Sequence, residues 1–140
     1  MGAVELADTS AWTNQERSAT TAEAFAQGLL DGGIAMCPPV RFELLQMTRD
    51  AIEFEARRRR LDTLRLLAVG PREWRRAEDV FFQLAELGPL HHRSVPLPDL
   101  LVAAAAERAE IPVLHYDRHF ELIASVTGQP VRAIAPLGSL

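Results

Sequence analysis

VELADTSAW, residues 4–12, is a short, mostly apolar run that ends on an acid and is followed at once by two hydroxyl residues. The apolar part, Val4 to Asp8, predicts a short β-strand. Thr9 and Ser10 are good caps for a helix, which is predicted to run through the Ala-rich stretch Ser18 to Leu30. A strand that leads into a helix in this way is the repeating unit of an alternating α/β fold.

Outward from this unit, strands and helices continue to alternate. Further strands are predicted over Ile34–Cys37, Val113–Tyr116 and Val131–Ile134. Helices are predicted from Pro38 onward and over Asp50–Val69, Arg72–Leu87, Asp99–Glu110 and Arg118–Val126, with a loop over Leu90–Leu97. In the helix Arg72–Leu87, one face should carry Trp74, Ala77, Phe81 and Leu84. No repeat, linker or low-complexity segment interrupts the pattern.

Short apolar strands between helices predict a parallel sheet covered on both faces. We therefore expect a three-layer α/β/α domain over residues 1–140, with about four or five parallel strands. Ligands on such sheets bind beyond the carboxyl ends of the strands. Asp8 and Asp117 each follow a predicted strand, and Asp99 heads a helix, so all three should lie near that edge.

Composition is that of a globular protein, with 48% hydrophobic and 24% charged residues. The net charge of −4 at first argues against a nucleic-acid partner, but all 15 cationic side chains are arginines, and eight of them lie between Arg57 and Arg76. Cys37 has no second cysteine to pair with, which fits a reducing cytoplasm. We expect neither a signal peptide, from the sequence of Met1–Asp8, nor a membrane span.

Four motifs, in order along essentially the whole chain, resemble those of PIN domains. Each contains one acid: LADTSAW with Asp8, RFELLQ with Glu43, LPDLLVAAAAE with Asp99 and LHYDRHFELIA with Asp117. The last motif is close to its form in actinobacterial VapC toxins. Each motif alone is weakly specific, whereas the four together identify the chain as similar to the toxin half of VapBC-type toxin–antitoxin pairs.

The resemblance implies a metal-dependent endoribonuclease in which Asp8, Glu43, Asp99 and Asp117 form the metal site. It also implies Mg²⁺ or Mn²⁺ as cofactor, an RNA substrate, a homodimer and a VapB-type antitoxin. Converging carboxylates suit this chemistry because hard divalent ions prefer oxygen ligands and can assist phosphodiester hydrolysis. Two alternatives stay open: an RNA- or phosphate-binding module with weakened catalysis, and a metal phosphohydrolase acting on small molecules.

Each acid also has a purely structural interpretation. Asp8 could serve as a turn or cap residue, Glu43 could be a solvated charge, and Asp117 could cap the following helix. Asp99 in a first turn is favoured by the helix dipole. A capping carboxylate can still bind a metal ion, so the interpretations are compatible.

Residues beside the acids are ambiguous as well. Many relatives carry a further acid two positions after the fourth, where this chain has His119; this side chain could bind a metal-bound water or a phosphate, or lie on the surface. Thr9 and Ser10 could support the site or only cap a helix, and Tyr116 could stack on a base or pack. The run Arg57–Arg60 could grip RNA or be a solvated face.

Overall fold

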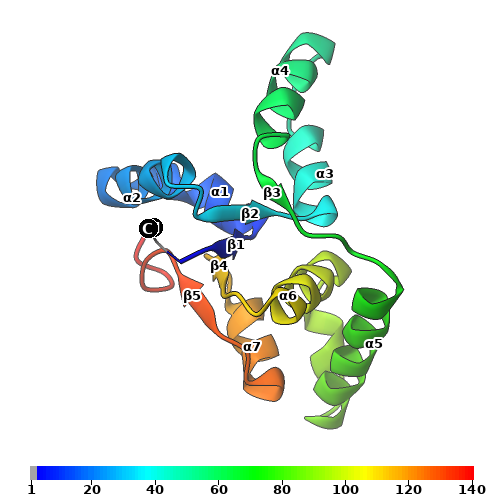
Figure 1. Ribbon diagram of the computed structural model, residues 1–140. Coiled ribbons are helices and arrows are strands. Elements are labelled where there is room, and N and C mark those ends of the chain that lie inside the picture. Colours follow the sequence, from blue (N-terminus) through cyan, green and yellow to red (C-terminus); the bar gives the residue numbers. More distant parts are fainter. Residues whose placement is uncertain (1–2) are drawn as a thin grey trace.

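The computed structural model describes residues 3–140 and contains a five-stranded sheet between helices (Figure 1). The strands are β1 Glu5–Ala7, β2 Ile34–Met36, β3 Arg65–Leu66, β4 Val113–His115 and β5 Val131–Ala133. The helices are α1 Thr9–Asn14, α2 Ala19–Leu30, α3 Pro38–Gln46, α4 Ala51–Leu61, α5 Pro71–Glu86, α6 Leu97–Ala109 and α7 Arg118–Thr127, with 3₁₀ turns at Gln15–Arg17 and His91–Ser94. Met1 and Gly2, the first two residues of the stretch in which no signal peptide is expected, lie outside this range.

All the strand pairs are parallel, in the order β3-β2-β1-β4-β5. β1 is central, and Leu6 is in register with Ala35 on one side and Val113 on the other. Since successive strand residues point to opposite faces, Leu6 and Ala7 enter different hydrophobic clusters. The predicted three-layer α/β/α architecture is confirmed.

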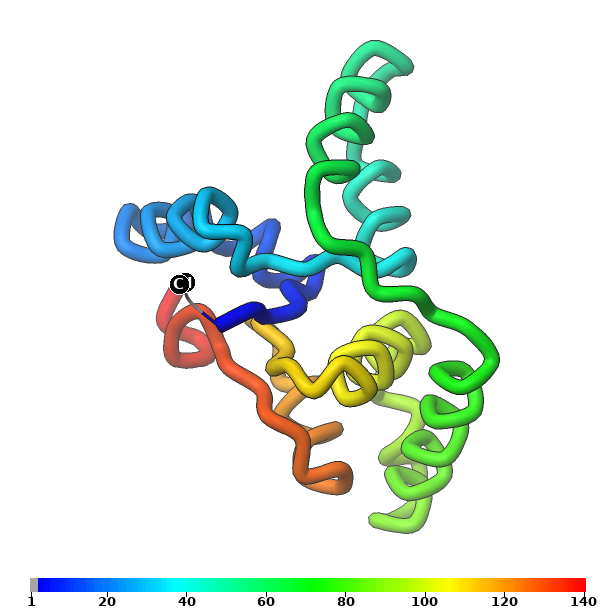
Figure 2. The backbone as a smooth tube through the Cα atoms, viewed as in Figure 1, coloured from blue at the N-terminus to red at the C-terminus, as the bar shows by residue number. Residues whose placement is uncertain are grey.

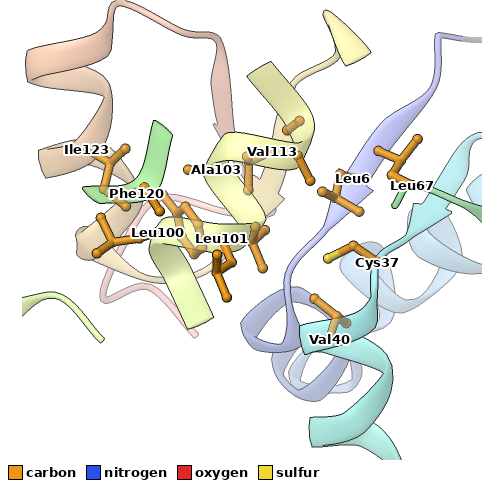
Figure 3. Close-up of a cluster of buried hydrophobic side chains, with 14 of the residues drawn as sticks. Leu6, Cys37, Val40, Leu67, Leu100, Leu101, Ala103, Val113, Phe120 and Ile123 are labelled. Carbon is orange, nitrogen blue, oxygen red and sulfur yellow. The ribbon is translucent and has the colours of Figure 1, made fainter. Parts of the chain in front are cut away.

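The two clusters differ in size. The smaller, on the face covered by α1 and α2, contains Ala7, Ala11, Phe25, Ile34 and Leu114. The larger fills the space between the other face and the helices α3, α5, α6 and α7, where Leu6, Val40, Leu101, Val113 and Phe120 come together (Figure 3). Burial of apolar surface stabilises a folded protein by about 25 cal/mol per Å². This burial on both faces of the sheet stabilises strands that are only two or three residues long.

α6 is the central element of the larger cluster. Its residues Leu100 to Ala106 are all buried, and it packs against α5, α7 and α3. A helix that is apolar on every side is a core helix. Asp99 lies directly before this buried segment. The packing of α6 in the core therefore determines where Asp99 lies.

α3 and α4 lie side by side and extend away from the sheet, and the chain then returns through β3 to α5 (Figure 2). The predicted helix Asp50–Val69 is wrong in its second half, because α4 ends at Leu61. The backbone N–H of Leu67 donates to the carbonyl of Met36 at 2.7 Å, so the segment beyond α4 pairs with β2 as an edge strand. Tertiary pairing overrides the helical pattern there.

Smaller differences concern α5 and its surroundings. Ala77 and Leu84 are buried as predicted, whereas Trp74 is 50% exposed and Phe81 38% exposed, so the predicted apolar face is only partly covered. The predicted loop Leu90–Leu97 contains a 3₁₀ turn, and α6 begins at Leu97, two residues earlier than predicted. Over residues 3–140, every helix falls short of the length and apolar character needed to cross a bilayer.

Candidate metal centre

Two acids end the adjacent strands β1 and β4 and cap the helices that follow. Asp8 Oδ2 accepts hydrogen bonds from the Ser10 backbone N–H at 2.9 Å and from the Ser10 hydroxyl at 2.7 Å. Asp117 Oδ1 accepts from the His119 backbone N–H at 2.9 Å. The capping interpretations of Asp8 and Asp117 are therefore confirmed, whereas the expected caps Thr9 and Ser10 are the first residues of α1 itself. Because the two strands are parallel neighbours, both carboxylates lie at the same edge of the sheet.

Asp99 reaches the same place from the first turn of α6. Its Oδ2 lies 3.0 Å from His119 Nδ1, and the same nitrogen lies 3.1 Å from Asp117 Oδ1. One ligand atom from each of Asp99, Asp117 and His119 falls within 4.8 Å of the others. Side chains that are 20 residues apart in sequence thus meet in one cluster.

Burial and mutual repulsion disturb the ionisation of these acids. Asp8 is 4% exposed and Asp99 9% exposed. Burial, together with the charges of Asp8 and Asp117, raises the pKa of Asp99 to about 7, although the His119 hydrogen bond opposes the rise. Burial also raises the pKa of Asp8, against the hydrogen bonds from Ser10 and Thr9. Several carboxylates close together repel one another when they are ionised. A bound cation would reduce this repulsion and favour their ionised forms.

Glu43 lies apart from the three-residue cluster. Its Oε1 accepts a hydrogen bond of 2.9 Å from the Thr9 hydroxyl, which ties α3 to the start of α1. Burial raises the pKa of the Cys37 thiol to about 12, and the charges of Asp8 and Glu43 add to the rise. The structure therefore places Glu43 near the same sheet edge through Thr9, but not in direct contact with the other acids.

Behind Asp117, the pair formed by the buried His115 and the exposed Glu121 was missed from the sequence as a functional feature. His115 is fully buried, and its Nδ1 accepts a hydrogen bond of 3.0 Å from the Asp117 backbone N–H. The proton must then sit on Nε2, which lies 3.1 Å from Glu121 Oε1 and donates to it. Burial lowers the pKa of His115 despite that carboxylate. A neutral imidazole thus fixes the backbone from which Asp117 projects; a histidine ending a buried strand was the available signal.

Ser10 and Tyr116 also connect the two strand ends. The Tyr116 backbone N–H donates to Ser10 Oγ at 3.0 Å. The Tyr116 hydroxyl accepts from the Leu140 backbone N–H at 2.8 Å. Tyr116 is therefore held by hydrogen bonds at its backbone and at its hydroxyl, which favours its structural interpretation over base stacking.

The run Arg57–Arg60 divides in two. Arg58 and Arg59 both pair with Glu55, as expected of a solvated face. Arg57 donates to the Leu44 carbonyl at 2.7 Å. Together with Arg60, Arg57 lines a groove of about 810 Å³ between α1, α2, α3 and α4. Apolar side chains form much of the rest of this groove: Trp12, Phe25, Leu29, Leu44 and Met47.

Comparison with known proteins agrees with this geometry. The PIN domain family matches residues 6–126. Ribonuclease VapC18 of Mycobacterium tuberculosis is 39% identical over 133 residues, which are 95% of this chain and 96% of the relative. Ribonuclease VapC21 of the same organism is 42% identical over 80 residues, 57% of this chain and 56% of the relative.

Solved structures have the same fold. DNA-bound VapBC from Salmonella typhimurium superposes with a TM-score of 0.69 at 17% identity, over 96% of this chain and all of the other. VapBC-5 from Mycobacterium tuberculosis gives 0.58 at 24% identity, over 94% of this chain and 98% of the other. At these identities the likeness concerns the fold.

Proposed function

Since this chain belongs to the PIN domain family, we propose that it is a metal-dependent endoribonuclease and the toxin of a VapBC-type toxin–antitoxin pair. The observation that carries the proposal is the meeting of Asp99 and Asp117, from α6 and from the end of β4, beside Asp8 at the end of β1. A full-length relative at 39% identity is named a ribonuclease, which supports RNA as the substrate.

The donor set fits Mg²⁺ or Mn²⁺. Asp8, Asp99 and Asp117 offer carboxylate oxygens at one edge. Burial first, and the neighbouring carboxylates second, raise the pKa values of Asp8 and Asp99. These three residues would hold the ion, and Glu43 would lie at the margin of the site. When bound, the ion would supply charge neutralisation at the phosphate and a water of lowered pKa.

The surrounding residues keep the acids in place. Ser10 fixes one oxygen of Asp8 through two hydrogen bonds, and Thr9 orients Glu43. His115 holds the backbone of Asp117. Because Asp8 and Asp99 are largely shielded from water, their orientation costs little further entropy when substrate arrives.

The test is cleavage of an RNA with single-stranded loops, which expose bases and backbone to proteins. We expect cleavage in Mg²⁺ or Mn²⁺ and none in excess EDTA. Asp8→Asn and Asp99→Asn should lower the rate by orders of magnitude, whereas Glu23→Gln, an exposed acid on α2, should not.

Other outcomes would select the alternatives. Cleavage undiminished in EDTA would refute the metal mechanism. RNA binding without cleavage would indicate a binding module, and turnover of a small phosphoester but not of RNA would indicate a phosphohydrolase. To identify a natural substrate, the 5′ ends of cellular RNA would be sequenced after the protein is induced.

We further propose that the groove between α1, α2, α3 and α4 binds a VapB-type antitoxin. An amphipathic helix would bury its apolar side on Trp12, Leu29 and Met47, and a cation beside it would reach toward the carboxylates. Co-purification from the native operon followed by mass spectrometry should recover a small companion protein. Leu29→Glu should weaken its retention, whereas Leu66→Glu, an exposed leucine outside the groove, should not. Recovery of this chain alone would contradict the partner while leaving the nuclease open.

A further inference from the structure

His119 is placed by the start of α7 rather than by the sheet. It is the second residue of that helix, and its backbone N–H is committed to Asp117 Oδ1. Its side chain is 24% exposed, and the ring turns Nδ1 toward carboxylates on two different helix starts. Within residues 3–140, Nε2 of this ring forms no hydrogen bond that would pull it elsewhere. The ring is therefore part of the acidic cluster and not of the outer surface.

The separations are those of atoms that share a metal ion. Oxygen or nitrogen ligands about 2.1 Å from a six-coordinate ion lie about 3.0 Å from their nearest fellow ligands. Nδ1 of His119 lies 3.0 Å from Asp99 Oδ2 and 3.1 Å from Asp117 Oδ1. A hydrogen bond explains the same distances in the metal-free protein, and a bound ion would replace it with little movement of the side chains.

We infer that His119 supplies a nitrogen ligand to the metal site and so gives this chain a preference for a first-row transition-metal ion over Mg²⁺. The inference rests on the proposed metal-dependent function. The reason is chemical: Mg²⁺ takes oxygen ligands almost exclusively, whereas imidazole suits the transition metals.

The preference is measured by binding rather than by turnover. Tag-free protein would be titrated with Mn²⁺ and with Mg²⁺ in a calorimeter, for the wild type, His119→Asp, His119→Gln and the control His91→Gln. His91 lies in the 3₁₀ turn before α6, outside the acidic cluster. His119→Asp should bind Mg²⁺ more tightly and lower the ratio of Mn²⁺ to Mg²⁺ affinity by about tenfold, as expected when a group at a metal site changes. His91→Gln should match the wild type.

Pulsed electron paramagnetic resonance on the Mn²⁺-loaded protein identifies the ligand atom directly. The wild type should show coupling of Mn²⁺ to a ¹⁴N nucleus, and both His119 variants should lose it. His115 cannot account for the coupling, because both of its ring nitrogens are engaged, by Asp117 and by Glu121. An aspartate also favours the first turn of a helix, so His119→Asp should fold normally.

Two results would overturn the inference: no ¹⁴N coupling in the wild type, or coupling that persists in His119→Gln. If Mn²⁺ binds without nitrogen and cleavage still needs a divalent ion, only the role of His119 is refuted. If neither ion binds and cleavage ignores EDTA, the proposed function falls as well.

Discussion

The hydroxyl of Ser10 accepts a hydrogen bond of 3.0 Å from the backbone N–H of Tyr116, 106 residues further along the chain. The same hydroxyl donates to Asp8 Oδ2, so one side chain joins the ends of β1 and β4. Ser10 therefore sets the spacing between the two strand ends from which Asp8 and Asp117 project.

Ser10→Ala should destabilise the protein by about 1–2 kcal/mol, because the Tyr116 N–H loses its acceptor and Asp8 loses its hydroxyl donor. Urea unfolding in EDTA measures this. Ser125→Ala is the matched control, since that exposed hydroxyl bonds only to the carbonyl of Leu122 in its own helix. Equal stability of the two variants would show that the bridge between the strands contributes nothing.

The stability of the metal-free protein should depend on the carboxyl of Asp99. Its pKa rises from 3.8 to about 7 on folding, so between these values the folded chain holds a proton that the unfolded chain has released. The stabilisation is complete below 3.8 and is lost as pH rises through about 7. In EDTA, the wild type should thus lose stability relative to Asp99→Asn over this range.

His115 contributes a pH dependence of the opposite sign, but it is present in both proteins. The difference between their unfolding free energies therefore isolates the contribution of Asp99. Burial lowers the pKa of His115, so its contribution is lost as pH falls. Unfolding free energies measured at several pH values between 4 and 8, in EDTA, would test the expectation. A constant difference between wild type and variant across this range would contradict it.

Divalent ions should stabilise the wild type more than Asp99→Asn. Mass action predicts about 2.7 kcal/mol at roughly a hundredfold excess of Mn²⁺ over its dissociation constant. The variant should lose most of this gain, while Glu23→Gln keeps it. Thermal melts with EDTA and with Mn²⁺ compare the three proteins. An Asp99→Asn protein that is destabilised in EDTA and still responds fully to Mn²⁺ would instead indicate a carboxylate that serves only its helix dipole.

Thr9→Val keeps the shape of the side chain but removes the donor to Glu43 Oε1. We expect RNA cleavage to fall by about tenfold, as for other partners that orient groups at a metal site. Stability should change by about 1 kcal/mol at most. Thr13→Val, which removes an exposed hydroxyl bonded to the Thr9 carbonyl, is the control. If Glu43→Gln impairs cleavage and Thr9→Val does not, Thr9 does not position that acid.

The predicted homodimer has a candidate surface on α5. Trp74 and Phe81 are half-exposed there and, with Val95 and Leu97, line an apolar groove of about 600 Å³. Apolar surface of this kind marks interaction sites. Trp74→Arg should therefore convert the dimer to a monomer in size-exclusion chromatography with light scattering. The control Leu30→Arg, at an 82% exposed leucine on α2, should leave the dimer intact. If Trp74→Arg also remains a dimer, the dimer contact does not involve this groove.

The sequence predicts most of the fold because its strands are short apolar runs ended by polar or turn residues. Four of the five strands are of this kind. The edge strand Arg65–Leu66 is different: both residues are exposed, and they follow an arginine-rich helix without a break that sequence alone reveals. Only pairing with β2 makes this segment a strand, and pairing is a tertiary property.

The candidate site divides along the same line. The positions of Asp8 and Asp117 are predictable because the carboxyl ends of parallel strands share one edge of the sheet. That of Asp99 is predictable because this residue heads the helix that comes before β4 in the sequence. Their roles as metal ligands, like that of Glu43, stay predictions. The partners of His119 and His115 were unpredictable: the contact of His119 with Asp99 depends on how α6 and α7 are turned relative to each other, and that of His115 with Glu121 on how α7 packs against β4.

The all-buried helix α6 affects which genetic variants would survive. Ala103, Ala104, Ala105 and Ala106 are all buried, and methyl groups added to a well-packed core typically cost about 1–3 kcal/mol. Bacteria forced to express the protein without its proposed antitoxin would escape by inactivating it. Sequenced survivors should therefore carry substitutions in this alanine run as often as in the acids, although none of these alanines belongs to the acidic cluster.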